Sequence, residues 1–204
     1  ADLGVSSMQI DNPERGFSYK QEGPLDLRLN PQNGEPASER LQKMNREEIE
    51  GMLIDNSDEP YAAEIARAIA GRKRKGQKID TTTKLAELIG ETLAFLPEKE
   101  RKEAVKKSCA RVFQALRIDV NSEFEVLEAF LTKLPSCMAP GGRIAILTFH
   151  SGEDRLVKRA FKEGKKAGIY SEVAEDVIRP SSEECVKNPR AKSTKMRWAV
   201  RAEE

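Results

Sequence analysis

The chain has 204 residues, of which 38% are hydrophobic and 34% are charged, and its formal net charge at pH 7 is +1. This apolar fraction is low but sufficient for a globular core, and the near-neutral charge excludes a protein whose whole surface is basic for nucleic-acid binding. No run approaches the roughly 18 apolar residues that a membrane span needs, so we expect no membrane partner.

The first residues, ADLGVSS, are typical of a buried strand that ends and enters a loop. Asp2 is therefore expected at the carboxyl end of a strand. Between residues 8 and 36 no helical or strand period is sustained, and the turn dipeptides NP, GP and NG recur. This pattern predicts a long ordered loop, and loops of this length usually carry function.

From residue 41 to residue 134 the apolar spacing becomes helical, which predicts a series of helices. Asn45 and Glu48 have the spacing of a capping box at the start of one of them. Thr82 or Thr83 is expected to cap another helix, and Ser122 to cap the last of the series.

A strand is expected at residues 143–149, where the sequence is apolar and follows a Pro-Gly-Gly turn. Such strands are typically covered on both faces, as in parallel α/β sheets. Ser151 and Asp154 then have capping-box spacing before a helix at residues 152–165. His150, the one histidine of the chain, and Ser151 would lie where a buried strand ends, which is where open α/β sheets bind ligands. Asp2 would lie at the same edge.

Weaker strand signals at residues 169–178 and 195–202 predict a hairpin that closes the edge of the sheet. The apolar strand at residues 143–149, of the kind that belongs to parallel sheets, places the chain in the α/β class.

Motifs for several common chemistries are missing from the sequence. There is no glycine-rich phosphate loop and no GxSxG nucleophile elbow. A serine hydrolase is disfavoured because Ser151 would need a histidine other than its neighbour His150. Cys109, Cys137 and Cys185 are widely spaced and form no CxxC pair, so we expect a reducing compartment and no metal site.

Two segments concentrate positive charge. Residues 72–78 follow a predicted helix and are either a solvated helix end, where the dipole favours cations, or a contact for RNA. Residues 188–193 have little apolar content, so phosphate contact by Arg190 and Lys192 is the favoured interpretation there. Phe17, Tyr19 and Trp198 are candidates either to stack on a base or to pack in a core.

Several multi-residue motifs, spread over the chain and in the right order, closely resemble the RsmH (MraW) family. They are residues 2–7 (DLGVSS) with Gln9, 15–18 (RGFS), 23–28 (GPLDLR), 113–118 (FQALRI), 120–121 (VN), 149–151 (FHS), 153–155 (EDR) and 188–193 (NPRAKS). Members of this family are S-adenosylmethionine-dependent methyltransferases that modify the exocyclic N4 of a cytidine in the decoding region of small-subunit, 16S-type ribosomal RNA.

The resemblance implies the C-terminal part of a Rossmann-like class I methyltransferase sheet with an inserted all-helical domain. Residues 1–30 and 119–204 would form the incomplete methyltransferase domain, and residues 31–118 the insertion that recognises substrate. The family's upstream part, with its glycine-rich cofactor loop, has no counterpart here, so we expect this chain alone to be inactive. The family also has His-Pro-Ala where this chain has Ser108-Cys109-Ala110, so no role of that histidine is carried over.

Site residues follow from the same resemblance. Asp2 and Gln9 match family contacts to S-adenosylmethionine. We hypothesise that His150 and Ser151, beside Asp2, orient or deprotonate the amine. The residues expected to shape the cytidine pocket are Arg15, Phe17, Asp26 and Arg28.

The expected partner is small-subunit ribosomal RNA or the ribosomal subunit, and a homodimer is among the open alternatives. The expected compartment is a bacterial cytoplasm, or a plastid or mitochondrion if the source is eukaryotic. The alternative function is a non-catalytic RNA-binding module that acts through the helical insertion and the basic C-terminal segment.

Overall fold

The computed structural model describes residues 1–203, which form two compact units. One unit comprises Ala1–Gly4 and Phe124–Glu204, and is called the sheet unit below. The other, Val5–Glu123, is called the helical unit. None of the helices among the described residues is both long enough and apolar enough to cross a membrane.

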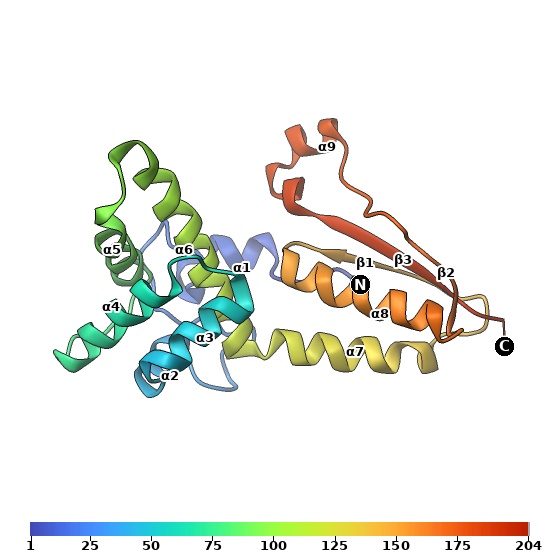
Figure 1. Ribbon diagram of the computed structural model, residues 1–204, viewed down its shortest axis with the longest axis horizontal. Helices are drawn as coiled ribbons and strands as arrows, with labels where there is room; N and C mark the ends of the chain where they lie inside the picture. Colours follow the sequence, from blue (N-terminus) through green and yellow to red (C-terminus); the bar gives the residue numbers. More distant parts are fainter. Residues whose placement is uncertain (204) are drawn as a thin grey trace. The chain divides into compact units, whose positions relative to one another are not determined.

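The helical unit consists of helices of different lengths around one core (Figure 1). Its elements are α1 (Ser7–Asp11), η1 (Pro13–Arg15), α2 (Ala37–Lys43), α3 (Arg46–Ser57), α4 (Ala62–Arg74), α5 (Thr82–Thr92), η2 (Leu93–Phe95) and α6 (Glu98–Asn121). Leu25 and Leu27 from the long loop are fully buried in this core, so the loop is fixed to the helices. Residues 5–30 therefore pack with the helices.

The helix caps confirm one prediction and correct two. The capping box at α3 is present, with the Glu48 N–H donating to Asn45 Oδ1 at 2.9 Å and the Asn45 N–H donating to Glu48 Oε2 at 2.7 Å. The cap of α5 is Thr81, because the Thr82 hydroxyl is buried and donates to the Gln21 carbonyl at 2.7 Å. Ser122 is the left-handed C-cap of α6, with φ 48°, and does not begin the next helix as predicted.

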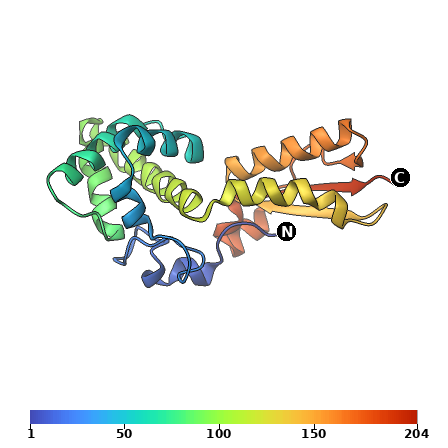
Figure 2. The same cartoon turned by 90° about the horizontal axis from the view of Figure 1, so that it is seen from below.

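Three strands form the sheet, in the order β1 (Arg143–Thr148), β3 (Lys195–Arg201), β2 (Tyr170–Val173). The remaining elements of the sheet unit are α7 (Glu123–Cys137, whose first residue belongs to the helical unit), α8 (Ser151–Lys166), α9 (Ser182–Lys187) and η3 (Pro189–Ser193). In both views α7 and α8 cover one face of the sheet (Figures 1 and 2). The core of the unit lies between these helices and the strands, around Ile146, Phe161 and Ala199.

The pairing of β1 differs from the prediction of a parallel strand covered on both faces. β1 is antiparallel to β3, in a register that runs from Arg143 opposite Val200 to Thr148 opposite Lys195. Burial alternates along β1, with Ile146 buried and Ala145 exposed, so only the face toward the helices is covered. The expected antiparallel pair of C-terminal strands is present, but β3 is central in the order and β2 lies at the edge.

The other edge of β1 carries the parallel neighbour that the first residues predict. The Leu147 N–H donates to the Ala1 carbonyl at 2.9 Å, and the Leu3 N–H donates to the Leu147 carbonyl at 3.1 Å. Asp2 thus bridges Leu147 in parallel orientation. Residues 1–3 thus pair with β1 on the edge opposite β3, through one isolated parallel bridge at Asp2.

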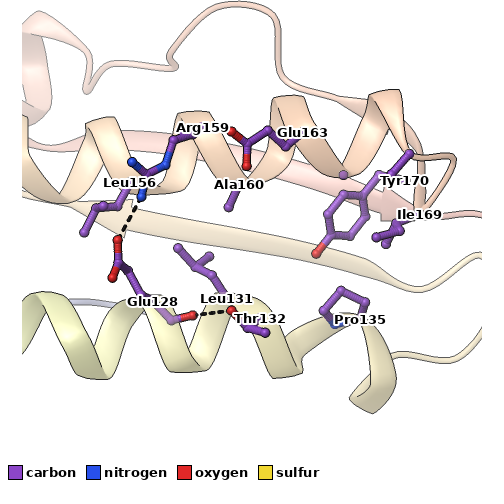
Figure 3. Close-up of a pocket in the computed structure, with 12 residues that line it drawn as sticks. Glu128, Leu131, Thr132, Pro135, Leu156, Arg159, Ala160, Glu163, Ile169 and Tyr170 are labelled. Atoms are coloured by element: carbon purple, nitrogen blue, oxygen red, sulfur yellow. Dashed lines mark hydrogen bonds and ion pairs between the residues drawn. The ribbon is translucent and has the colours of Figure 1, made fainter.

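A groove of about 480 Å³ separates α7 from α8 on the side away from the strands (Figure 3). Leu131, Leu156 and Ala160 contribute apolar side chains to it, and the Glu128–Arg159 ion pair lies at its rim. The Tyr170 ring packs edge-on against Phe161 with 5.5 Å between the ring centroids.

Candidate functional site

The turn from β1 to α8 is held by the side chain of His150. His150 is the N-cap of α8, with extended backbone angles, and its Nδ1 accepts the Glu153 N–H at 3.4 Å. The predicted capping box of Ser151 and Asp154 is therefore wrong. Ser151 is the first helical residue and is exposed, so its hydroxyl is available to a ligand.

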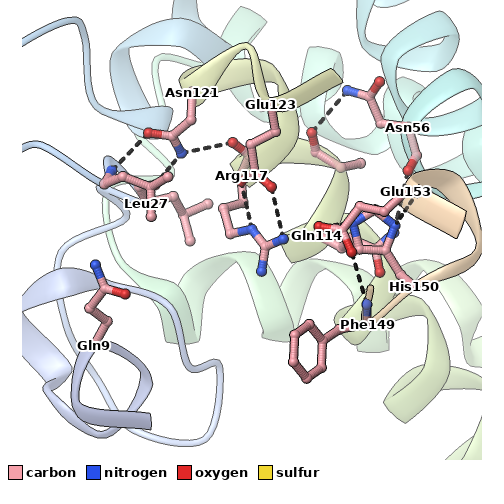
Figure 4. Close-up of polar contacts among 12 residues, drawn as sticks. Gln9, Leu27, Asn56, Gln114, Arg117, Asn121, Glu123, Phe149, His150 and Glu153 are labelled. Atoms are coloured by element: carbon pink, nitrogen blue, oxygen red, sulfur yellow. Dashed lines mark hydrogen bonds and ion pairs between the residues drawn. The ribbon is translucent and has the colours of Figure 1, made fainter. Parts of the chain in front are cut away.

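Glu153 completes this turn from within the helix. It is only 3% exposed, and its Oε2 accepts the Phe149 N–H at 2.9 Å (Figure 4). Its Oε1 lies 3.3 Å from His150 Nε2, although Nε2 is buried and makes no hydrogen bond among the described residues. Because Nδ1 is an acceptor in the cap, a neutral His150 carries its proton on Nε2. In this tautomer the Nε2–H faces Glu153 Oε1, and Nδ1 is the ring atom that can accept a proton, once it releases the Glu153 N–H.

We expect Glu153→Ala to destabilise the sheet unit by about 1–3 kcal/mol, because the Phe149 N–H loses its acceptor. Glu153→Gln keeps a carbonyl acceptor and should cost less. The matched control is Glu163→Ala, an exposed position on the same helix, for which we expect no measurable change. Urea denaturation followed by the fluorescence of Trp198 on β3 measures the difference, and equal midpoints for Glu153→Ala and the control would contradict the bracing role.

Asp154 is committed to β3 in a partly buried ion cluster. Arg197 Nε donates to Asp154 Oδ1 at 2.7 Å, Arg197 Nη2 to Oδ2 at 3.3 Å, and Lys195 Nζ to Oδ2 at 3.4 Å. Burial of the carboxyl acts to raise its pKa, but the hydrogen bonds and charges of Arg197 and Lys195 outweigh burial and hold the pKa of Asp154 below its usual value. This cluster ties the first turn of α8 to the central strand.

Asp2 lies on the same edge of the sheet unit as the β1–α8 turn. It pairs with Leu147, three residues before His150, and the Gly4 that follows it faces the Phe149 ring. A Cβ at Gly4 would lie 3.7 Å from that ring. The Asp2 side chain is exposed and makes no hydrogen bond or ion pair to the described residues, so its carboxylate is free to accept hydrogen bonds from a ligand.

Four predicted substrate residues form one cluster in the helical unit. Asp26 accepts two hydrogen bonds from the Arg28 guanidinium, at 2.6 and 2.9 Å. Burial acts to raise the pKa of Asp26, but the hydrogen bonds from Arg28 outweigh burial and lower that pKa. Arg15 donates to the carbonyls of residues 28 and 29 at 3.0 and 2.9 Å, and its guanidinium lies 5.6 Å from the Phe17 ring centroid. The cluster is therefore an ordered surface whose charges already hold its own loop.

Asn121, at the end of α6, was not predicted as a site residue, although it supports this loop. Its Nδ2 donates to the Leu27 carbonyl at 2.8 Å, and its Oδ1 accepts the Leu29 N–H at 2.7 Å (Figure 4). Leu27 has φ 65°, a left-handed conformation that costs free energy for a branched side chain. Asn121 thus binds the Leu27 carbonyl and the Leu29 amide, and so stabilises the strained turn.

The remaining predicted residues lie on surfaces. Gln9 Oε1 accepts the Ser6 N–H at 2.8 Å in a capping box at α1, which leaves its amide NH₂ for a ligand. Arg190 and Lys192 are both exposed on η3, on either side of the buried Ala191. The sequence showed no helix at α1, although Ser6 and Gln9 have the spacing that would have indicated it.

Comparison with known proteins gives this arrangement a family context. A sequence model of the MraW methylase family matches residues 1–202. Ribosomal RNA small subunit methyltransferase H 1 of Lachnoclostridium phytofermentans is 65% identical over 202 residues, which are 99% of this chain and 55% of that protein. The protein of the same name from Agathobacter rectalis is 68% identical over 203 residues, 100% of this chain and 58% of that protein. The chain thus spans a little over half the length of these curated relatives.

Proposed function

The chain belongs to the MraW methylase family, and from this premise we propose that it is part of an enzyme that methylates the N4 of a cytidine in the decoding region of small-subunit ribosomal RNA, with S-adenosylmethionine as methyl donor. The observation that carries the proposal is the identity of 65–68% over nearly the whole chain to proteins named as small-subunit ribosomal RNA methyltransferases. The substrate is found in a bacterial cytoplasm or in an organelle with bacterial-type ribosomes.

The sheet unit supports the proposed Rossmann-like fold. Residues 1–3 and β1 are parallel neighbours, and an antiparallel strand beside them is common in sheets of this kind. We propose that residues 1–30 and 119–204 carry the methyltransferase chemistry and that residues 31–118 are the helical insertion for substrate recognition. This functional division follows the motifs, whereas residues 5–30 pack with the helices because Leu25 and Leu27 belong to the helical core.

The residues that would hold the cofactor have suitable donors and acceptors. Asp2 presents an uncommitted carboxylate, and Gln9 an amide NH₂ not used in its cap. Each is proposed as a separate contact to S-adenosylmethionine. When bound, this group supplies an electrophilic methyl on a sulfonium centre.

The protein must then position a weak nucleophile. The lone pair of the cytosine amine is delocalised into the ring, so holding the amine in line with the methyl group accounts for most of the catalysis. The base must also leave its stack, which favours an aromatic wall such as Phe17 beside Arg15. We propose that Ser151 and His150 orient the amine or take up its proton, which His150 would accept at Nδ1 once that atom releases the Glu153 N–H. We also propose that Asp26 and Arg28 hold the pocket loop and that Arg190 and Lys192 contact phosphates.

The experiment is a chimera in which this chain replaces the matching 202 residues of the Lachnoclostridium phytofermentans relative. With labelled S-adenosylmethionine and small-subunit ribosomal RNA, we expect N4-methylcytidine in the digested RNA. If the unaltered relative methylates this RNA and the chimera methylates nothing, or methylates another atom, the proposal is wrong.

A second candidate function is RNA binding without catalysis, which the exposed cations of η3 favour. Titrations of the 204-residue chain with S-adenosylmethionine and with RNA separate the two. RNA binding by the chain combined with an inactive chimera would support the non-catalytic function.

In the chimera, we expect His150→Ala to lower the rate of methyl transfer by about 100-fold, which is typical of the loss of a group that accepts a proton. Because His150 also caps α8, the informative comparison is His150→Asn, which supplies a cap oxygen without an imidazole. A rate for His150→Asn equal to that of the unaltered chimera would remove the ring from the chemistry and leave it a capping role.

A further inference from the structure

The end of α4 carries an excess of positive charge that local sequence does not neutralise. Between residues 72 and 79 there are five lysines and arginines and no acidic residue. The helix ends at Arg74, and the chain turns at Gly76, which has φ 69°. Figure 1 shows this end of α4 extending clear of the neighbouring helices of its own unit.

Two of these cations have structural partners. Arg72 Nη2 lies 2.5 Å from Glu91 Oε2 on α5. Lys73 Nζ donates to the Met44 carbonyl, in the connection between α2 and α3. These contacts fix the last turn of α4 in the helical unit and so give the remaining cations a rigid base.

Arg74, Lys75 and Lys78, called the α4 cluster below, have no such partners. All are exposed, and none makes a side-chain hydrogen bond or ion pair with the described residues. The nearest acidic residue along the chain, Asp80, forms its ion pair with Lys84 at 2.6 Å, and Lys78 acts on it only through its charge, which helps to lower the pKa of Asp80. The helix dipole favours cations only in the last turn, so it offers a reason for Arg74 and Lys75 but none for Lys78, which lies beyond the turn.

We propose that the α4 cluster binds the phosphodiester backbone of the RNA substrate; this rests on the proposed function. Unpaired lysines and arginines on a fixed base are suited to phosphate oxygens, and binding releases the counterions condensed on the RNA. Contacts of this kind set the position of a nucleic acid without reading its bases. The cluster therefore anchors the RNA on the helical unit and contributes affinity, not sequence selectivity.

The test compares two triple variants of the 204-residue chain. Arg74→Gln/Lys75→Gln/Lys78→Gln removes the α4 cluster. Lys162→Gln/Lys165→Gln/Lys166→Gln removes the same number of exposed cations from the last turns of α8 and serves as the matched control. Both sets lie on exposed positions, and circular dichroism checks that each variant keeps its helices.

Binding to a small-subunit ribosomal RNA transcript is measured over a series of salt concentrations. Each lost phosphate contact reduces the slope of log K against log salt by about 0.7–0.9, so the cluster variant should lose about 2–3 in slope and bind on the order of 100-fold more weakly at about 0.1 M salt. The control should change the slope by less than about 1.

Three results would overturn the proposal: equal slopes for the two variants, no RNA binding by the parent chain, or cluster-dependent binding to anionic phospholipid vesicles with RNA binding unchanged. The slope is read from binding alone, so an inactive chimera rejects the proposed enzyme without deciding about the cluster. Conversely, an active chimera with an unchanged slope in the cluster variant rejects the cluster alone.

Discussion

Replacing Arg197 by alanine is expected to lower the free energy of unfolding of the sheet unit by about 3–5 kcal/mol. Arg197 is 6% exposed and makes two hydrogen bonds to Asp154, whose carboxylate would keep only Lys195, at 3.4 Å. Breaking a buried pair by removing one partner is costly because the other charge stays desolvated. The pair also joins β3 to the first turn of α8, so the β1–α8 turn loosens with it.

The measurement is urea denaturation followed by the fluorescence of Trp198, the single tryptophan, which adjoins Arg197 on β3. The control is Arg159→Ala on α8. Arg159 donates to Glu128 at 2.8 Å, but both side chains are more than half exposed, so the loss should be about 0–1 kcal/mol. Similar losses for the two variants would show that burial does not strengthen the Asp154 pair.

The pH dependence of this pair has a definite sign. Because the pKa of Asp154 is lower in the folded state than in the unfolded chain, the stabilisation is complete above the unfolded pKa, near about 4. It disappears as the pH falls below that value through the folded pKa. The advantage of the parent chain over Asp154→Asn should therefore be constant near neutral pH and shrink in acid, and an advantage that grows in acid would contradict this assignment.

Local signals in the sequence located the elements but not always their ends. The capping box of α3 was predictable because Asn45 and Glu48 contact each other across one turn. Ser122 has similar spacing to Glu125, yet it ends α6, because the helix continues to Asn121 and only the left-handed turn stops it. Sequence spacing alone does not distinguish a serine that starts one helix from a serine that ends another.

The β1–α8 turn shows why a site residue can be predicted without its contacts. The end of an apolar strand indicated His150, but serine is the usual cap and histidine is not, so the wrong residue was expected to begin α8. The antiparallel neighbour of β1 was missed for a related reason. An apolar run is compatible with either direction of pairing, and β3 lies about fifty residues further along the chain.

The loop of the helical unit depends on contacts that are still more distant in sequence. Motifs indicated Arg15, Asp26 and Arg28, and the structure brings them together. Asn121 holds the same loop from 92 and 94 residues away, through the backbone of Leu29 and Leu27. No periodicity in a single sequence relates positions so far apart, so its supporting role needed the fold.

Glycine at position 16 is required where two parts of this loop cross. Gly16 has φ 71°, and a Cβ added there would lie 2.2 Å from the Pro24 carbonyl oxygen and 2.9 Å from the Asp26 amide nitrogen. Gly23, in the second of the two crossing segments, is equally close to the first: a Cβ added there would lie 2.0 Å from the Pro13 carbonyl oxygen. Backbone lies on both sides of the crossing, so neither part can rotate out of the way as a side chain would.

We expect Gly16→Ala to destabilise the helical unit by about 2–5 kcal/mol, of which about 1–2 is the left-handed backbone and the rest is displacement of the crossing segments. Two controls separate these costs. Gly34 also has a positive φ, 74°, but an added Cβ there would meet no other atom, so Gly34→Ala should lose only the cost of the left-handed backbone. Gly51 lies within α3, where an added Cβ also meets no atom, so Gly51→Ala should raise the stability by about 0.5–1 kcal/mol.

Circular dichroism during urea denaturation reports the helical unit, and hydrogen exchange of residues 13–28 reports the crossing itself. Equal losses of stability for Gly16→Ala and Gly34→Ala would mean that the two crossing segments can move apart at no cost in free energy. If instead the loss is larger at Gly16, the crossing is rigid. The positions of Arg15 and Asp26 are then fixed by the close backbone contact at Gly16, which only glycine permits.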